Sequence, residues 1–493
     1  MFIFNNNRFI CIFDKEEIKN LIKTIKKTFL VYRAGSYNLN KDREIVIIGC
    51  GASGGTAAQF AHKTDRKAKI TILEQGKYPQ YSKCGLPYAI SGIIPNFNDL
   101  FEFSEEWFKK NNIDLKLETY VEKIDTKKQI IYAKKGNKKI EKNYDYLIIC
   151  TGASPTLPSI ENLDSDGVFV LRTIDDAKAI SSYIKKKANA VIVGAGLIGI
   201  ELAESLYKKD MKVTIVEALS NILPTVFDDD ISELIKQNMP DDINLYFNHF
   251  AKKIEVKNGK IKKLLIKDRK SGENKKIDAD ILVISTGVKP EIELAKKIGC
   301  KIGETGSIVV NEKAETSVKN VYAAGDCTEY IDFVTKKPVH VGLGSIAVRQ
   351  GIAAGVNAAG GKHVLPKGVL QTFTSEFFDI EFAGVGSTTN LLDVFSTVSG
   401  KLNGSSLPDY YPGGKKITIK CIADEKTGRI LGVQAVGDKA AQRVNTFACA
   451  ILGNMDIDTF RKLETAYAPP IAPTLDVETL VGDIVALKLS RKK

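Results

Sequence analysis

Two segments of this 493-residue chain share one pattern of residues. Each begins with a short run rich in β-branched residues, over 44–48 and 190–193, which ends in Gly-x-Gly-x-x-Gly and continues as a sequence suited to a helix. Unbroken apolar runs of this length are typical of strands buried on both faces of a parallel sheet. The glycines are Gly49, Gly51 and Gly54 in the first segment and Gly194, Gly196 and Gly199 in the second. The pattern predicts two strand–turn–helix units.

The glycines in this spacing have separate physical roles. One makes the tight turn, another lets a pyrophosphate approach the backbone, and a third lets the helix pack on the strand. The phosphate then lies on the unpaired N–H groups of the helix N-terminus. Each unit also has an acid at the end of its second strand, Glu74 and Glu217, placed to accept a hydrogen bond from a ribose hydroxyl. Because the whole pattern occurs twice, we expect the chain to bind two dinucleotides.

Three further apolar runs end in small or polar residues. Residues 146–149 lead into Thr151 and Gly152, and residues 281–284 lead into Gly287, so both read as crossing points between two nucleotide domains. A third run, over 321–324, ends before Asp326 and is followed by a small-residue helix expected at 343–360. From about residue 366, strands are expected at 416–422 and 430–436 and a helix near 439–452, without a glycine-rich loop.

Together these motifs resemble the pyridine-nucleotide disulfide oxidoreductases, from about residue 44 to about residue 485. The resemblance implies that the first loop, with Ser53 and Glu74, binds FAD, and that the second, with Glu217, binds NAD(P)H. It implies that Asp326 serves the flavin ribityl chain and that Glu201 lies near the nicotinamide. Thr151, Gly152 and Gly287 are expected beside the cofactors.

The resemblance also implies an α/β architecture: two Rossmann-like dinucleotide-binding domains plus a C-terminal α+β dimerisation domain. The expected parts are an N-terminal extension (1–43), the FAD-binding domain in two pieces (44–155 and 285–365), the NAD(P)H-binding domain (156–284) and the dimerisation domain (366–493). A homodimer follows from this architecture.

The number of cysteines near Cys84 indicates which branch of the family the chain resembles. Glutathione-reductase-like members have two cysteines in this region, whereas the segment 81–88 has Cys84 alone. It resembles the single-cysteine branch of coenzyme A disulfide reductases, NADH oxidases, NADH peroxidases and sulfur reductases. These enzymes often have a serine four residues before the cysteine, where this chain has Gln80 and its nearest serine is Ser82.

The chemistry of a lone cysteine agrees with that branch. Only the thiolate attacks sulfur, and a positive dipole such as a helix N-terminus lowers the thiol pKa. Reduction through one cysteine must pass through a mixed disulfide, a sulfenic acid or a persulfide. The alternative is a buried structural cysteine, since cysteine is often buried.

Two features separate members of that branch. Oxidase and peroxidase relatives have a histidine at the position of Ser53, which disfavours oxygen chemistry here. Coenzyme A disulfide reductases use two tyrosines of the dimer partner to protonate the leaving thiolate, and we expect Tyr411 and Tyr467 in that role. Tyr410 is the alternative to Tyr411, and tyrosine packing at the dimer interface is the alternative function of all three.

The nicotinamide preference is predicted from the second acid. Glu217 would repel a 2′-phosphate, and the following residues, 218–220, contain no arginine to hold one. We therefore expect NADH to be preferred over NADPH.

The bulk composition excludes several other classes of protein. The eight cysteines are scattered, which argues against a disulfide framework and a metal site and favours a cytoplasmic setting. No apolar run is long enough to span a membrane. The net charge of +12 is weak evidence for nucleic acid, and no motif supports that partner. Residues 15–30 are a candidate basic amphipathic helix, either a plain extension or a targeting or partner segment.

The expected function is hydride transfer from NAD(P)H through FAD and Cys84 to a low-molecular-weight disulfide, chiefly coenzyme A disulfide or polysulfide. One alternative is an NADH oxidase that reduces oxygen to hydrogen peroxide or water. An alternative of another class is a redox-sensing flavoprotein with a binding role.

Overall fold

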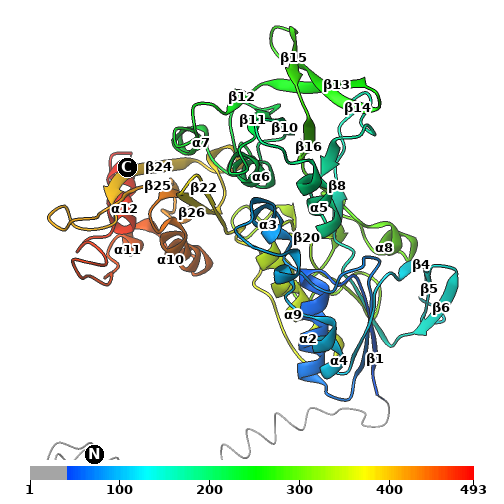
Figure 1. Cartoon of the computed structure of the whole chain (residues 1–493). Helices are drawn as coiled ribbons and strands as arrows, with labels where there is room; N and C mark the ends of the chain where they lie inside the picture. Colours follow the sequence, from blue (N-terminus) through cyan, green and yellow to red (C-terminus); the bar gives the residue numbers. More distant parts are fainter. Residues whose placement is uncertain (1–41, 493) are drawn as a thin grey trace, which may run out of the picture. The chain divides into compact units, whose positions relative to one another are not determined.

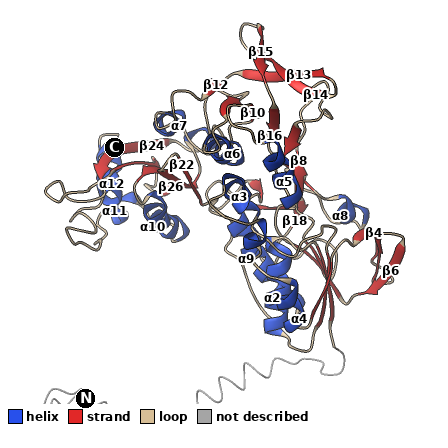
Figure 2. Cartoon of the chain, viewed as in Figure 1, coloured by secondary structure: helices blue, strands red, loops and turns tan. Residues whose placement is uncertain are grey.

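The computed structural model describes residues 42–492. Almost all of the expected N-terminal extension, including the candidate helix over 15–30, lies outside the described residues. The helices and strands of the described part are shown in Figures 1 and 2.

The first glycine segment forms the centre of a five-stranded parallel sheet in the order β19-β7-β1-β2-β3. Its apolar residues Ile45, Val46 and Ile47 have no exposed surface, as expected for a strand covered on both faces. The strands are β1 (Glu44–Ile48), β2 (Lys69–Leu73), β3 (Ile113–Lys116), β7 (Tyr146–Ile149) and β19 (Val321–Ala323). Since β19 pairs with β7 after a long excursion of the chain, this sheet is built from two separate parts of the sequence.

Helix α2 (Ala52–Thr64) follows the first glycine loop, and α9 (Gly344–Ala358) packs alongside it (Figure 1). Glycines make this approach possible: a Cβ on Gly351 would lie 2.4 Å from the Ser53 carbonyl oxygen, and one on Gly355 would lie 2.2 Å from that of Ala57. The small residues of the expected helix over 343–360 therefore serve close helix packing.

The second glycine segment lies at the centre of another parallel sheet, in the order β12-β11-β10-β16-β9. Its strands are β9 (Val168–Val170), β10 (Asn189–Val193), β11 (Lys212–Val216), β12 (Asn244–Tyr246) and β16 (Ile281–Ile284), and its helices are α5 (Ile174–Tyr183), α6 (Leu197–Tyr207) and α7 (Asp229–Lys236). Short antiparallel strands β8 (Ala153–Pro155) and β17 (Val288–Pro290) pair where the chain passes between the two sheets.

Each nucleotide unit also carries a three-stranded antiparallel sheet. One consists of β4 (Tyr120–Asp125), β5 (Ile130–Lys135) and β6 (Lys138–Asn143), and the other of β13 (His249–Lys257), β14 (Lys260–Asp268) and β15 (Asn274–Asp278). A small sheet of β18 (Ile308–Val309), β20 (Thr328–Ile331) and β21 (Pro338–His340) lies near the end of the first unit's sequence. The shorter helices are α3 (Leu86–Ser91), α4 (Glu105–Lys110) and α8 (Glu293–Lys297).

The C-terminal part is an antiparallel sheet in the order β22-β23-β26-β25-β24, with helices packed on it (Figure 2). Helix α10 contacts β23 and β26, and α12 contacts β24 and β25. The elements are β22 (Phe373–Phe377), β23 (Ile380–Gly386), β24 (Thr397–Ser405), β25 (Lys416–Asp424), β26 (Ile430–Gly437), α10 (Ala440–Leu452), α11 (Ile457–Phe460) and α12 (Val477–Ser490). The expected strands and helix of this part are confirmed.

A buried polar network joins the second nucleotide unit to this C-terminal sheet. Asp228 accepts hydrogen bonds from the Thr389 hydroxyl at 2.7 Å and the Gln434 amide at 2.9 Å, and pairs with Lys420 at 2.8 Å. Burial alone would raise the pKa of Asp228, but these three partners hold it below its usual range.

The expected fold class, two Rossmann-like units and a C-terminal α+β part, is confirmed. The domain boundaries at 155, 284 and 365 stay predictions. Across residues 42–492, no helix combines the length and the apolar character needed to cross a membrane.

Candidate active site

A cavity of about 2200 Å³ lies between the two glycine loops and extends to the C-terminal sheet. It is larger than the roughly 300–1,000 Å³ typical of pockets for a single small ligand. Twelve of the fourteen predicted cofactor-binding residues line it; Gly54 and Gly199 do not. Those on the wall are Gly49, Gly51, Ser53, Glu74, Thr151, Gly152, Gly194, Gly196, Glu201, Glu217, Gly287 and Asp326.

The first loop turns sharply from β1 into α2. Gly49 has φ of +98°, and a Cβ there would lie 2.2 Å from the Cys150 carbonyl oxygen. Gly54 faces the turn itself, since its Cβ would lie 1.9 Å from the Gly49 carbonyl oxygen. Gly51, the N-cap of α2, lines the cavity, and a Cβ there would meet no atom within 4 Å. Two glycines therefore serve backbone packing, and the third leaves the helix N-terminus open to a phosphate.

The second loop repeats these features. Gly194 has φ of +108°, with its Cβ position 2.4 Å from the Ser285 carbonyl oxygen, and a Cβ on Gly199 would lie 2.0 Å from the Gly194 carbonyl oxygen. Gly196 is the N-cap of α6 and is as open as Gly51. Gly54 and Gly199 are absent from the cavity wall because they hold helix against strand.

The two acids are held in the same way. Glu74 accepts hydrogen bonds from the backbone N–H groups of Cys50 and Gly76, both at 2.6 Å. Glu217 accepts from those of Ala195 at 2.7 Å and Leu219 at 2.8 Å. Each carboxylate oxygen keeps a second lone pair, so both acids remain able to accept a hydrogen bond from a ribose hydroxyl.

Asp326 meets a partner that the sequence did not indicate. Its carboxylate pairs with the Arg172 guanidinium at 2.7 Å, and Arg172 also donates to the Ala153 carbonyl oxygen at 3.0 Å. Ser53 donates to the Ala324 carbonyl oxygen at 3.1 Å, next to the strand end that carries Asp326. Arg172 belongs to neither the glycine motifs nor the cysteine motif. It reaches Asp326 because the fold brings together two segments that are 154 residues apart in the chain.

Thr151, Gly152 and Gly287 lie where the chain passes between the two sheets. The Thr151 hydroxyl donates to the Glu291 carbonyl oxygen at 2.5 Å. Gly152 and Gly287 have φ of +71° and +93°, a backbone conformation that favours glycine. These residues shape the crossing and line the cavity.

Cys84 lies in a one-turn 3₁₀ segment, Lys83–Gly85, just before α3. Among the described cysteines it alone is both exposed and on the cavity wall: Cys150 lines the cavity but is buried, and Cys449 is exposed elsewhere. The alternative of a buried structural cysteine therefore does not fit Cys84.

The charges around Cys84 differ from the sequence expectation. Although Cys84 is reached from the cavity, the protein around the thiol limits its hydration, and this is the main cause that raises the thiol pKa; Glu201 and Asp326 raise it further, and Arg172 opposes them. The sequence expectation of a lowered thiol pKa considered only a helix N-terminus, whereas the structure places two carboxylates near Cys84.

Two further side chains near the thiol were missed by sequence reasoning. Lys83 keeps an exposed face on the cavity, yet the protein around it and the Arg172 charge lower its pKa to about 8. Ser375, on β22, donates to Glu201 at 2.5 Å. Burial raises the pKa of Glu201 above its usual range, and Glu204 adds to this. No local motif singles out Lys83 or Ser375.

The three predicted tyrosines are on the surface of the C-terminal part. The hydroxyl oxygens of Tyr410 and Tyr467 are 2.7 Å apart, with exposed fractions of 71% and 47%. Tyr411 is adjacent and 37% exposed. None of them lines the cavity formed by this chain. The structure thus joins Tyr467 with Tyr410, and the catalytic roles expected of Tyr411 and Tyr467 stay predictions.

Two glycine loops at the N-termini of α2 and α6, each with an acid, and an accessible thiol on one cavity wall are the features of a two-dinucleotide oxidoreductase. The family described as pyridine nucleotide-disulphide oxidoreductase matches residues 43–351, and its dimerisation domain matches residues 372–478. The chain belongs to this family, whose members use FAD and NAD(P)H.

Proteins similar over nearly the whole chain have related names. An NADH oxidase of Methanocaldococcus jannaschii is 38% identical over 91% of this chain and 99% of its own length. An NAD(P)H sulfur oxidoreductase (CoA-dependent) of Pyrococcus abyssi is 36% identical over 88% and 96%. The solved structure of an NAD-dependent persulfide reductase from A. fulgidus is 34% identical, covers 91% of this chain and 84% of its own, and has a TM-score of 0.87.

Proposed function

We propose that this chain is an NAD(P)H-dependent reductase of low-molecular-weight disulfides or polysulfides, with Cys84 as the thiol that meets the substrate. The observation that carries the proposal is the position of Cys84: it is the accessible thiol on a cavity that also reaches both glycine loops. The names of the Pyrococcus and A. fulgidus relatives support a sulfur substrate. Coenzyme A disulfide and polysulfide are the acceptors we favour.

The residues present suit FAD at the first loop. Gly51 leaves the N-terminus of α2 open for a pyrophosphate, Glu74 is set to hold a ribose, and Asp326 is held at the cavity by Arg172. Bound FAD would supply hydride acceptance from NAD(P)H and return the electron pair to sulfur. The second loop, with Gly196 and Glu217, would hold the nicotinamide nucleotide.

The role of Cys84 is a balanced exchange of sulfur bonds. Its thiolate attacks one sulfur of the disulfide R–S–S–R, so a Cys84–S–R bond forms and R–S⁻ leaves. The electron pair from NAD(P)H then breaks the mixed disulfide, which restores the Cys84 thiolate and releases a second R–S⁻. The hydride of NAD(P)H supplies the electron pair and one proton, so one disulfide, one NAD(P)H and one further proton give two thiols and NAD(P)⁺.

A second copy of the chain would supply the proton donors. The hydroxyls of Tyr410 and Tyr467 are joined but lie away from the cavity of their own chain, so we place them at a homodimer contact. Other exposed apolar side chains of the C-terminal part support such a contact: Leu391, Val394, Leu463, Ile471, Leu475 and Leu487. A tyrosine hydroxyl stays protonated at neutral pH and can donate to a leaving thiolate.

Oxygen reduction is the second candidate, since the M. jannaschii relative is named an NADH oxidase. Ser53 is the residue at the position where a histidine was expected for that chemistry. Its hydroxyl donates a hydrogen bond to the Ala324 carbonyl oxygen, and its side chain is buried. We therefore rank the oxidase second.

The mass of the Cys84 peptide from protein purified without reductant tests the proposal. A mixed disulfide with coenzyme A, or added sulfur atoms, that NADH removes would support it. A single added oxygen would favour the oxidase instead. A free thiol that does not react with added coenzyme A disulfide would contradict the proposal.

A further inference from the structure

The loop after Glu217 is joined to the start of β13 at one end of the cavity. The backbone N–H of His249 donates to the Glu217 carbonyl oxygen at 3.0 Å, and that of Asn248 donates to the Leu219 carbonyl oxygen at 2.9 Å. The cavity wall here consists of Glu217, Ala218, Leu219, His249, Phe250 and Ala251. With Glu217 as the ribose-binding acid of the proposed function, this is the adenosine end of the nicotinamide nucleotide site.

A cation that the local sequence does not contain lies beside this end: Arg269 is not on the cavity wall itself, but it contacts two residues that are, Ala218 and Phe250. Arg269, directly after β14, donates from Nη1 to the Ala218 carbonyl oxygen at 2.8 Å. Its guanidinium lies 5.1 Å from the centre of the Phe250 ring, and its backbone N–H donates to Asn248 at 2.8 Å. Strand pairing between β13 and β14 brings it to the loop from 51 residues further along the chain.

The acids nearby are occupied by other groups. Both Glu217 oxygens accept backbone hydrogen bonds, and Asp268 accepts from the N–H groups of Lys270 and Ser271 at 2.7 Å and lies 3.8 Å from His249. Within residues 42–492, no carboxylate lies within 4.0 Å of the Arg269 guanidinium. Since a guanidinium has five N–H donors, Arg269 has donors left for an anion beside Ala218.

We propose that Arg269 binds the 2′-phosphate of NADPH, so that this chain accepts both NADPH and NADH. Guanidinium groups recognise phosphate through charge-assisted, often bidentate hydrogen bonds. The expectation that NADH is preferred rested on repulsion of a 2′-phosphate by Glu217 and on the lack of an arginine at 218–220. Arg269 reaches the same loop from the neighbouring hairpin and would oppose that repulsion. The inference rests on the proposed function only in its assignment of the second loop to the nicotinamide nucleotide.

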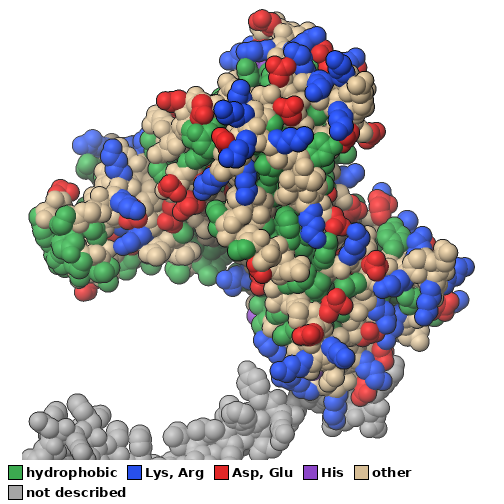
Figure 3. All heavy atoms as spheres, viewed as in Figure 1, with side chains coloured by type: hydrophobic (Ala, Val, Ile, Leu, Met, Phe, Trp, Pro, Cys, Tyr) green, Lys and Arg blue, Asp and Glu red, His purple; other side chains and the backbone are tan. Residues whose placement is uncertain are grey.

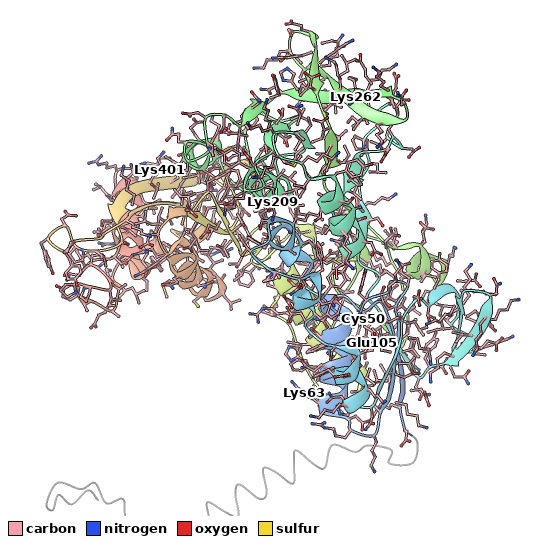
Figure 4. The ribbon with its side chains drawn as sticks, viewed as in Figure 1. Cys50, Lys63, Glu105, Lys209, Lys262 and Lys401 are labelled. Atoms are coloured by element: carbon pink, nitrogen blue, oxygen red, sulfur yellow. The ribbon has the colours of Figure 1, made fainter. Side chains whose placement is uncertain are left out.

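Lysines and arginines crowd the β13–β15 sheet (Figure 3), so the test needs a matched control on the same sheet. Lys262 is exposed on β14, towards its other end (Figure 4). Seven residues of strand place it about 23 Å from Arg269. Lys262→Ala removes the same charge from the same sheet without touching the loop after Glu217.

Calorimetric titration of the FAD-loaded protein with 2′,5′-ADP and with 5′-AMP is the direct experiment. These fragments differ in the 2′-phosphate and need no turnover. We expect Arg269→Ala to weaken 2′,5′-ADP about tenfold and 5′-AMP less than about twofold. Arg269→Lys should recover part of the loss because the charge remains, and Lys262→Ala should leave both affinities as in the wild type.

Three results would overturn the inference. Wild-type protein that does not bind 2′,5′-ADP lacks the site. An equal loss for both fragments in Arg269→Ala would mean that the arginine contacts adenine, and no loss for either would mean that it contacts neither. Disulfide-dependent NADH consumption by the wild type reports separately on the proposed function, so either idea can fail while the other stands.

Discussion

The hydroxyl oxygens of Tyr410 and Tyr467 are 2.7 Å apart. Removing either hydroxyl tests whether this pair donates a proton to the leaving thiolate or only packs at the dimer interface. We expect Tyr467→Phe to lower the rate of disulfide reduction about 10- to 1,000-fold, because water replaces a general acid only in part. Tyr410→Phe should have a similar effect. The measurement is NADH consumption with coenzyme A disulfide.

Tyr411→Phe is the comparison for that pair, since Tyr411 is adjacent in sequence. A large loss in Tyr411→Phe together with a normal rate in Tyr410→Phe would reverse the assignment. Normal rates in all three variants, with the dimer intact, would leave the tyrosines as packing residues.

The individual residues that could be predicted from the sequence are those that belong to a local sequence motif. Cys84, Glu74 and Glu217 could be found because spacing along the chain identifies them. Arg172 and Arg269 could not, since their partners lie 154 and 51 residues away and only strand pairing and domain contacts bring them together.

Among the structural elements, the N-termini of α2 and α6 can be tested by the same substitution. A glutamate in place of the N-cap glycine should remove FAD at α2 and NADH at α6. Gly51→Glu should yield protein without yellow FAD, because a carboxylate would take the pyrophosphate position at the N-terminus of α2. Gly196→Glu, the matched change at α6, should keep FAD and lose NADH binding. Absorbance of the purified proteins and an NADH titration measure both.

A normal flavin content in Gly51→Glu would contradict the assignment of the first loop to FAD. Loss of flavin in both variants, with helix content unchanged, would mean that the two loops do not act separately.

The parallel strands and their helices were predictable because continuous apolar runs and glycines mark them. The sheets β4–β6 and β13–β15 were not predicted. Apolar residues are interspersed with lysines in these strands; in β14, Ile261, Leu264 and Ile266 are buried. Such a pattern does not predict which strands will pair with a half-exposed strand.

In the whole molecule, the order of the units was implied by the family resemblance, in which the second nucleotide unit is inserted into the first. β19 does join the sheet of β1 through β7. The attachment of the C-terminal sheet to the second unit was not predictable, because the network of Asp228, Lys420 and Gln434 joins residues about 200 positions apart. The domain boundaries, the cytoplasmic setting and the homodimer stay predictions.

The proposed function requires that electrons leave the protein through Cys84. The measurement is steady-state NADH consumption with coenzyme A disulfide, with polysulfide and with oxygen, in wild type and Cys84→Ser. A serine hydroxyl is not ionised at neutral pH and cannot carry a disulfide. We expect Cys84→Ser to keep FAD and still let NADH bleach it, but to lose disulfide and polysulfide reduction by several orders of magnitude.

Cys449→Ser is the control, because Cys449 is the other exposed cysteine of residues 42–492 and lies off the cavity wall. It should consume NADH with the disulfide at the wild-type rate. Equal disulfide-dependent rates in wild type and Cys84→Ser would show that Cys84 is not the electron outlet and leave a flavin oxidase as the better description.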